Sequence, residues 1–313
     1  MKVSIIIRAL NEEKHLGKLF RGLAEQTYRN FEVIFVDSGS NDNSVAIAQE
    51  NNAKIINIPK EKFSFGRSLN FGCKAASGEI LVFISAHVYP VSRKWLSNMV
   101  SPFDDNAVSI VYGRQIGNEF TKFSEHQIFN KWFPEKSNYD QEDYFTNNAN
   151  CATRKSIWLR NPYDEQLTGL EDLYFSKNVK SKGGRIVYSA DAEIVHIHEE
   201  TFMQTKNRYM REAIAMKYIE PSYSFSFSSF IRNFLLSVKE DVSLALTQNK
   251  FTENFLSIVA FRFAQKYGTY QGFNKTEEIN DSLYNKFYSY DGKNPALKSS
   301  VKTSKDLIDY EKE

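Results

Sequence analysis

Cysteine is scarce in this sequence, and long apolar runs and a marked excess of one charge are absent. The two cysteines, Cys73 and Cys151, have no CxxC partner and no histidine nearby. Isolated cysteines of this kind predict reduced thiols in a core, and a disulfide is the less favoured alternative. A formal net charge of +2 without a basic run argues against a nucleic-acid partner.

Targeting signals are also missing. The apolar run that begins at Val3 ends at Arg8 and Asn11, which a signal peptide would not do. No stretch approaches the roughly 18 apolar residues that span a bilayer. We therefore expect a cytoplasmic protein, with at most a peripheral contact at the inner face of a membrane.

The N-terminal third of the chain alternates between two apolar patterns. Short buried runs predict strands over residues 3–7, 31–36, 53–58 and 80–85. Helical spacing predicts helices over residues 12–26, 44–51 and 68–76. This alternation predicts an α/β protein, with a mostly parallel central sheet covered by helices on both faces. Ligands bind at the carboxyl ends of such strands, where Asn11, Asp37 and His87 fall.

The remaining sequence predicts a second group of elements and a helical extension. We expect helices over 92–100, 155–159 and 171–181, strands over 109–113, 185–188 and 193–198, and an irregular loop over 117–150. Three further helices are expected over 203–220, 225–246 and 252–267. The predicted organisation is an α/β domain (1–220), a helical extension (221–290) and a polar, mobile tail (291–313).

Four ordered segments carry a family resemblance. They are Ser4–Glu13; Glu32–Asp42; Asn70-Phe-Gly with Ala76–Glu79 and Leu81–His87; and Tyr163-Asp-Glu with Gly169–Asp172, Gly183–Tyr188 and Ala192–His198. Over residues 1–215 this set resembles the family 2 glycosyltransferases, which share the GT-A fold. The resemblance implies an inverting enzyme that transfers sugar from a nucleotide-sugar donor to a saccharide or glycolipid acceptor, in bacterial surface polysaccharide synthesis.

The resemblance also assigns a nucleotide-sugar site. Its residues in this sequence are Arg8, Asn11, Glu12, Asp37, Ser38, Arg67, Ser85, Ala86 and His87. Asp37 matches the family residue that contacts the nucleobase, although an Asp before Gly39 also suits a turn bonded to its own backbone. Asn11 suits a helix cap equally well. Asp42 either contacts ribose or caps the next helix. Arg67 either contacts the donor phosphate or is a solvated surface residue.

The usual metal ligands of the family are missing. Where relatives carry Asp-x-Asp, which holds Mn²⁺ or Mg²⁺, this chain has Ser85-Ala86-His87. The family's metal-binding histidine aligns with His196, and His198 lies two residues further on the expected strand, on the same face. A site of His87 with His196 or His198, metal-free catalysis, and histidines satisfied in the core all remain open.

The pair Glu171-Asp172 matches the family's acidic pair near the acceptor. A displacement at the anomeric carbon needs a base beside the acceptor hydroxyl, so Asp172 is the candidate base and Glu171 the second choice. Acidic residues also offset the dipole at a helix N-terminus, which is the competing interpretation.

Two regions and two further function classes stay open. Aromatic and amide side chains in 122–150 suit sugar contacts or a hydrophobic plug, and Phe227, Arg232 and Lys239 suit a packed helical subdomain, a dimer surface or an anionic membrane.

A non-catalytic nucleotide-sugar-binding or scaffold protein is the alternative function. A nucleotidyltransferase is disfavoured, because no glycine-rich phosphate loop with lysine is present. The oligomeric state is not indicated.

Overall fold

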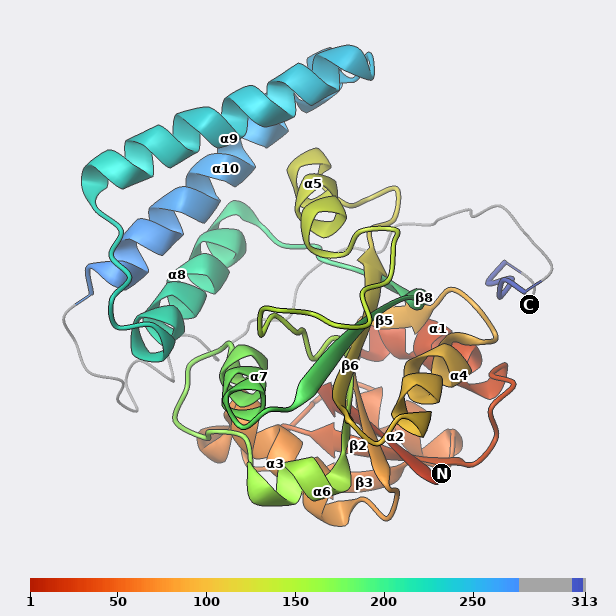
Figure 1. The fold of residues 1–313 in the computed structure, drawn as a ribbon. Coiled ribbons are helices and arrows are strands. Elements are labelled where there is room, and N and C mark those ends of the chain that lie inside the picture. Colours follow the sequence, from red (N-terminus) through yellow and green to blue (C-terminus); the bar gives the residue numbers. More distant parts are fainter. Residues whose placement is uncertain (276–305, 312–313) are drawn as a thin grey trace.

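The computed structural model describes residues 1–275 and 306–311, and within them eight strands form one sheet (Figure 1). The strand order is β3-β2-β1-β4-β7-β6-β8-β5. The strands are β1 (Val3–Ala9), β2 (Phe31–Asp37), β3 (Lys54–Asn57), β4 (Ile80–Ser85), β5 (Val88–Pro90), β6 (Val108–Ile116), β7 (Asn150–Arg154) and β8 (Arg185–His196).

The half of the sheet built from β3, β2, β1 and β4 is parallel, as predicted. The other half is mixed, because β7 runs antiparallel to β4 and β6, and β5 runs antiparallel to β8. The strands β6 and β8 are parallel to each other. The predicted α/β class with a mostly parallel, helix-covered sheet is therefore confirmed.

The helices of the described chain fall into two groups: the first seven lie on the two faces of this sheet, and the last three lie at one side of it (Figure 1). They are α1 (Glu13–Ala24), α2 (Ser44–Glu50), α3 (Phe65–Ala75), α4 (Trp95–Val100), α5 (Phe123–Trp132), α6 (Lys155–Arg160), α7 (Glu171–Ser181), α8 (Phe202–Ile219), α9 (Phe227–Thr247) and α10 (Phe251–Phe273).

Two apolar cores follow from the alternation of side chains along the strands. Ile5 and Ile7 of β1 join the core that includes residues of α1, α2 and α4. Ile6, between them, joins the core that includes residues of α3, α5, α6 and α7. Cys73 and Cys151 are buried in this second core as free thiols, which confirms the prediction for both cysteines.

The structure corrects three predictions of secondary structure. The segment 117–150 is not a continuous loop, since it contains α5 and ends at the start of β7. The strands expected over 185–188 and 193–198 are one strand, β8, which stays paired to β6 through irregularities in register and ends at His196. The three-residue strand β5 was missed, because it is too short to show a period.

The helices α8, α9 and α10 pack together beside α5, at one side of the sheet domain (Figure 1). Buried polar contacts join three of these elements. The Arg262 guanidinium of α10 donates two hydrogen bonds to the Asp241 carboxylate of α9, Nε to Oδ2 at 2.7 Å and Nη2 to Oδ1 at 2.8 Å. The Ser124 hydroxyl of α5 donates to Asp241 Oδ2 at 2.6 Å. The boundaries predicted at residues 220 and 290 stay predictions, and most of the predicted tail lies outside the described residues.

The described C-terminal residues 306–311 lie against the outer edge of the sheet beside β5. The Ile308 amide donates to the Val91 carbonyl at 3.0 Å, and the Tyr310 hydroxyl donates to the Pro90 carbonyl at 2.6 Å. A Cβ on Gly22 of α1 would lie 2.4 Å from the Tyr310 hydroxyl, which explains a glycine inside that helix. Among the described residues, no helix combines the length and the apolar character needed to cross a bilayer.

The buried pair in the helical extension yields a stability prediction. Asp241→Ala should lower the free energy of unfolding by about 3–5 kcal/mol, because it leaves the Arg262 charge buried without a partner. Denaturant unfolding measures the change. Glu240→Ala, which removes the exposed neighbouring carboxylate, should change the value by less than about 0.5 kcal/mol. Equal effects of the two variants would contradict the importance of the buried pair.

Candidate active site

The candidate site residues gather where three parallel strands end at the same edge. In the register of the sheet, Ala9 of β1 pairs with Asp37 of β2, and Arg8 pairs with Ser85 of β4. The loops that follow these strands carry Asn11 and His87. The sequence expectation that these side chains come from neighbouring strand ends is therefore confirmed.

Asp37 is 4% exposed and closes the turn that follows β2. Its Oδ2 accepts hydrogen bonds from the amides of Gly39 and Ser40 at 2.9 and 3.1 Å. Gly39 adopts φ +89°, a conformation that favours glycine. The local turn considered from the sequence is thus present, and it fixes the carboxylate at the carboxyl edge of the sheet. Beside it, the buried Ser38 hydroxyl has no hydrogen-bond partner within the described chain.

Asn11 links two loops rather than capping α1. Its backbone is left-handed, with φ 54°, and its side-chain oxygen accepts from the Asn41 amide at 2.9 Å. Helix α1 begins at Glu13 and has Glu12 at its cap position, without a side-chain capping bond, so the predicted Asn11 cap is wrong. Asp42 accepts from the Ser44 amide at 3.0 Å in the first turn of α2 and from the Glu13 amide at 3.1 Å.

Arg8 brings the acidic pair to this edge of the sheet. Its Nη1 donates to Glu171 Oε1 at 3.2 Å, which joins the end of β1 to the first residue of α7. The Arg8 guanidinium carbon also lies 4.8 Å from the centre of the Phe65 ring, a cation–π distance. Glu171 is 5% exposed, so this ion pair is largely shielded from solvent.

Asp172 is held by backbone amides and is itself 9% exposed. Its Oδ2 accepts from the Asn148 amide at 2.9 Å, and its Oδ1 accepts from the Leu173 amide at 2.8 Å. Burial and the adjacent Glu171 carboxylate raise the pKa of Asp172 to about 7, although these amides and Arg8 act in the opposite direction. A carboxyl group with a pKa near neutrality can exchange a proton with a substrate at physiological pH.

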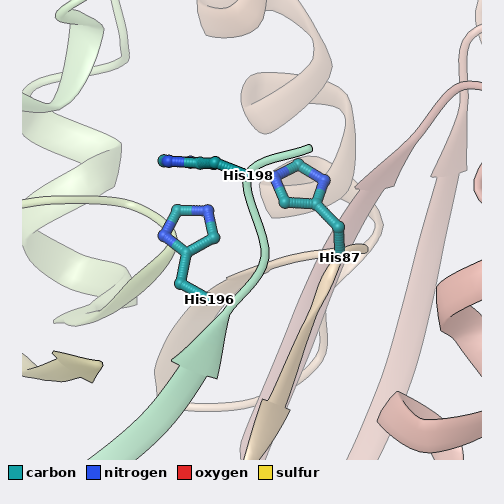
Figure 2. A group of neighbouring side chains, drawn as sticks. All are labelled: His87, His196 and His198. Atoms are coloured by element: carbon teal, nitrogen blue, oxygen red, sulfur yellow. The ribbon is translucent and has the colours of Figure 1, made fainter. Parts of the chain in front are cut away.

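Three histidines form a cluster (Figure 2). Each of His87, His196 and His198 offers one potential ligand atom, and these atoms lie within 4.8 Å of one another. The ring centres of His196 and His198 are 4.1 Å apart, and those of His87 and His196 are 5.2 Å apart. His198 lies beyond the end of β8, so the predicted shared strand face is wrong, but both side chains still reach the same cluster.

The charges around the histidines are balanced by carboxylates. Burial alone would raise the pKa of Glu125, but the His198 ring and the Arg208 guanidinium outweigh burial and lower this pKa to about 2. Burial alone would lower the pKa of His87, but the Glu12 carboxylate outweighs that effect and the pKa is raised overall. Burial, together with the neighbouring histidines, lowers the pKa of His196 well below its usual value.

The donor set of the cluster fits a divalent metal ion. The buried Nε2 of His196 has no hydrogen-bond partner within the described chain, and a low pKa leaves its lone pair available at neutral pH. Imidazole nitrogens are common ligands of divalent transition metals. The residues that could hold an ion are therefore His87, His196 and His198 together, rather than His87 with one of the other two.

Other predicted site residues have different surroundings. Arg67 is 36% exposed in its side chain, and its Nε donates to Glu165 Oε2 at 2.8 Å while Nη1 donates to the Lys62 carbonyl, so its guanidinium already has a counter-charge. Ser85 ends β4, and Ala86, 1% exposed, packs in the core before the chain reaches His87.

Sequence reasoning missed the side chains that support the histidines. Glu125 and Gln115 accept hydrogen bonds from His198 and His196, and Arg208 of α8 donates to Glu125 Oε1 at 2.7 Å. The sequence offered a weak signal, Glu125 among the aromatic residues of 122–133. Its role depends on α5 and α8 being packed beside the end of β8.

Comparisons with known proteins agree with this architecture. The family model described as Glycosyl transferase family 2 matches residues 4–168, more than half of the chain. The chain belongs to the family 2 glycosyltransferases. Two similar relatives of this glycosyltransferase are the O-antigen chain rhamnosyltransferases RfbN of Salmonella typhimurium and WbaN of Salmonella anatum. RfbN is 24% identical over 67% of this chain and 70% of its own length. WbaN is 26% identical over 61% of this chain and 64% of its own length.

Solved structures share the fold of this glycosyltransferase at low sequence identity. The mannosyltransferase PcManGT from Pyrobaculum calidifontis, in complex with GDP-Man and Mn²⁺, is 15% identical with a TM-score of 0.60 and 88% of each chain covered. TarS residues 1–349 of S. aureus, in complex with UDP-GlcNAc, is 16% identical with a TM-score of 0.52, covering 87% of this chain and 90% of that one. These likenesses confirm the GT-A fold.

The environment of Asp172 yields a titration prediction for the glycosyltransferase. In protein labelled with ¹³C at Asp carboxyl groups, the Asp172 signal is identified as the one that disappears in Asp172→Asn. In the unmodified protein, this signal should titrate with a midpoint of about 7. Arg8→Met should raise this midpoint, because it removes a positive charge that favours the carboxylate. The exposed Arg160→Met should leave the midpoint unchanged. An Asp172 midpoint close to that of an ordinary exposed aspartate would contradict the effect of burial.

Proposed function

We propose that this protein transfers a sugar, with inversion, from a nucleotide-sugar donor to a hydroxyl of a saccharide or lipid-linked saccharide acceptor, in synthesis of a bacterial surface polysaccharide. The observation that carries the proposal is a buried acidic pair, Glu171-Asp172, tied through Arg8 to the strand edge that also holds Asp37. Two relatives named as O-antigen chain rhamnosyltransferases support this substrate class.

The donor nucleotide would lie against the loops after β1 and β2. Asn11 and the turn that begins at Asp37 are already tied together, because the Asn11 amide donates to the Ser40 hydroxyl at 2.9 Å. This preformed surface offers Asp37 and Glu12 as acceptors and Ser38 as a donor for base and ribose. Structural neighbours bound to GDP-Man and UDP-GlcNAc support a nucleotide-sugar donor.

The acidic pair would serve the acceptor. Asp172 would take the proton of the acceptor hydroxyl, whose oxygen then forms a bond to the anomeric carbon. The bond from that carbon to the donor diphosphate breaks on the opposite face, which inverts the anomeric configuration. The amides of Asn148 and Leu173 would hold the base in place, and Glu171, paired with Arg8, would set the local charge.

Positive charge is needed where the nucleoside diphosphate leaves. A divalent ion held by His87, His196 and His198, with Mn²⁺ or Mg²⁺ as the expected ions, would supply that charge when bound. Arg8 and protonated His87 are the groups that would supply it in metal-free transfer. Activity that persists after exhaustive chelation would favour the second alternative.

A peripheral membrane contact and a cytoplasmic site of action stay hypotheses. Phe227 and Leu235 of α9 are each 59% exposed, whereas Phe230 is buried against α10. The exposed side chains suit a lipid surface that carries the acceptor, and they suit a second copy of the chain equally. Sedimentation with anionic vesicles distinguishes the two.

The proposed base gives a direct test. Asp172→Asn should lower the transfer rate by about 10²–10⁴-fold, because an amide cannot accept the acceptor proton. Donor affinity, measured by calorimetry, should change little, because Asp172 lies on the acceptor side of the proposed site.

Two controls accompany this test. Thermal unfolding shows whether the carboxamide introduced at position 172 disturbs the backbone contacts, and Asp164→Asn removes a carboxylate outside the acidic pair. A transfer rate of Asp172→Asn within tenfold of the unmodified enzyme would reject the assignment of the base. Loss of donor binding together with transfer in a folded variant would assign Asp172 to donor binding instead.

A further inference from the structure

Every imidazole in the histidine cluster has one nitrogen already engaged by an oxygen. His87 Nδ1 lies 2.9 Å from Glu12 Oε1, His196 Nδ1 lies 2.7 Å from Gln115 Oε1, and His198 Nδ1 lies 2.7 Å from Glu125 Oε1. Carboxylate oxygens of Glu12 and Glu125 only accept hydrogen bonds, so the facing Nδ1 atoms must carry the protons.

The same conclusion for His196 follows from a chain of hydrogen bonds that starts at the backbone. The Ala149 amide can only donate, and it donates to Asn147 Oδ1 at 3.0 Å. This oxygen also accepts from Gln115 Nε2 at 3.1 Å, which fixes the orientation of the Gln115 amide group. The Gln115 oxygen therefore faces His196, and the His196 ring must donate from Nδ1.

In the neutral rings, the Nε2 atoms are consequently left with lone pairs. His196 Nε2 is buried and has no hydrogen-bond partner within the described chain, which is costly unless something binds there. Figure 2 shows one ring nitrogen of His87 and one of His196 turned toward the middle of the cluster. Outer residues that fix histidine tautomers in this way are typical of built metal sites.

We propose that His87, His196 and His198 form a three-imidazole site that selects a borderline divalent ion, of the Zn²⁺, Co²⁺ or Fe²⁺ class, over Mg²⁺. Glu12, Gln115 and Glu125 are its positioning residues. Imidazole suits these transition metals, whereas Mg²⁺ prefers oxygen ligands in octahedral geometry. Of the two ions expected from the sequence, this donor set favours Mn²⁺.

The charges around the site support the same selection. Three neutral imidazoles leave the ion's two positive charges uncompensated in the inner shell, and the carboxylates of Glu12 and Glu125 lie one hydrogen bond away from it. Three protein ligands also leave coordination positions open, as in catalytic zinc sites. An oxygen of the donor diphosphate would fit an open position. That role rests on the proposed function, whereas binding of the ion alone does not.

Metal binding without substrate tests the proposal. Full-length protein, stripped with a chelator, should bind Zn²⁺ and Co²⁺ in calorimetric titrations with one ion per chain, and Mg²⁺ at least about 100-fold more weakly. Co²⁺ should produce visible absorption bands that Zn²⁺ abolishes. Gln115→Ala should weaken Zn²⁺ binding by about 10–100-fold, because the His196 tautomer is no longer fixed.

Two histidine variants complete the test. His87→Ala, which alters a partly exposed side chain, should abolish the Co²⁺ bands, and His126→Ala, which removes a histidine outside the cluster, should preserve them. Equal affinity for Mg²⁺ and Zn²⁺, no binding of either ion, or Zn²⁺ binding unaffected by His87→Ala and Gln115→Ala would overturn the proposal. If zinc binds as expected while Asp172→Asn keeps full transfer activity, only the assignment of the base fails.

Discussion

The register of β1 with its two neighbours is the constraint on which the rest of the site depends. Because Ala9 pairs with Asp37 and Arg8 pairs with Ser85, three loops leave the sheet at the same level. A slip of one residue would turn every side chain of a strand to its opposite face, so the packing of buried strands fixes their register. A rigid core thus places a polar turn, an arginine and a histidine side by side.

The acidic pair shows how this edge holds charges away from water. Burying a carboxylate is costly unless it is hydrogen-bonded or paired. Glu171 is compensated by Arg8, and Asp172 by the backbone amides of Leu173 in α7 and of Asn148 just before β7. The compensation is incomplete for Asp172, and this is why its pKa is raised. The same imbalance suits a residue that must accept a proton.

The helical extension is physically connected to the histidine cluster through α5. Ser124 contacts the buried pair of Asp241 and Arg262, and the next residue, Glu125, accepts from His198 and Arg208. The extension therefore helps to fix the position of a carboxylate whose partner lies at the end of β8. Its packing is part of the architecture of the site as well as of the stability of the chain.

The sequence by itself determined the α/β class, the free cysteines, the helix from Glu171 to Ser181 and the family, because these depend on local periodicity and ordered motifs. It also placed Asn11, Asp37 and His87 at strand ends. Only the tertiary structure decided the helix inside 117–150, the continuity of β8 and the failure of Asn11 to cap α1, since packing and pairing override local preference there. The tautomers of the histidines depend on Glu12, Gln115 and Glu125, which come from separate elements, and no local pattern encodes such contacts.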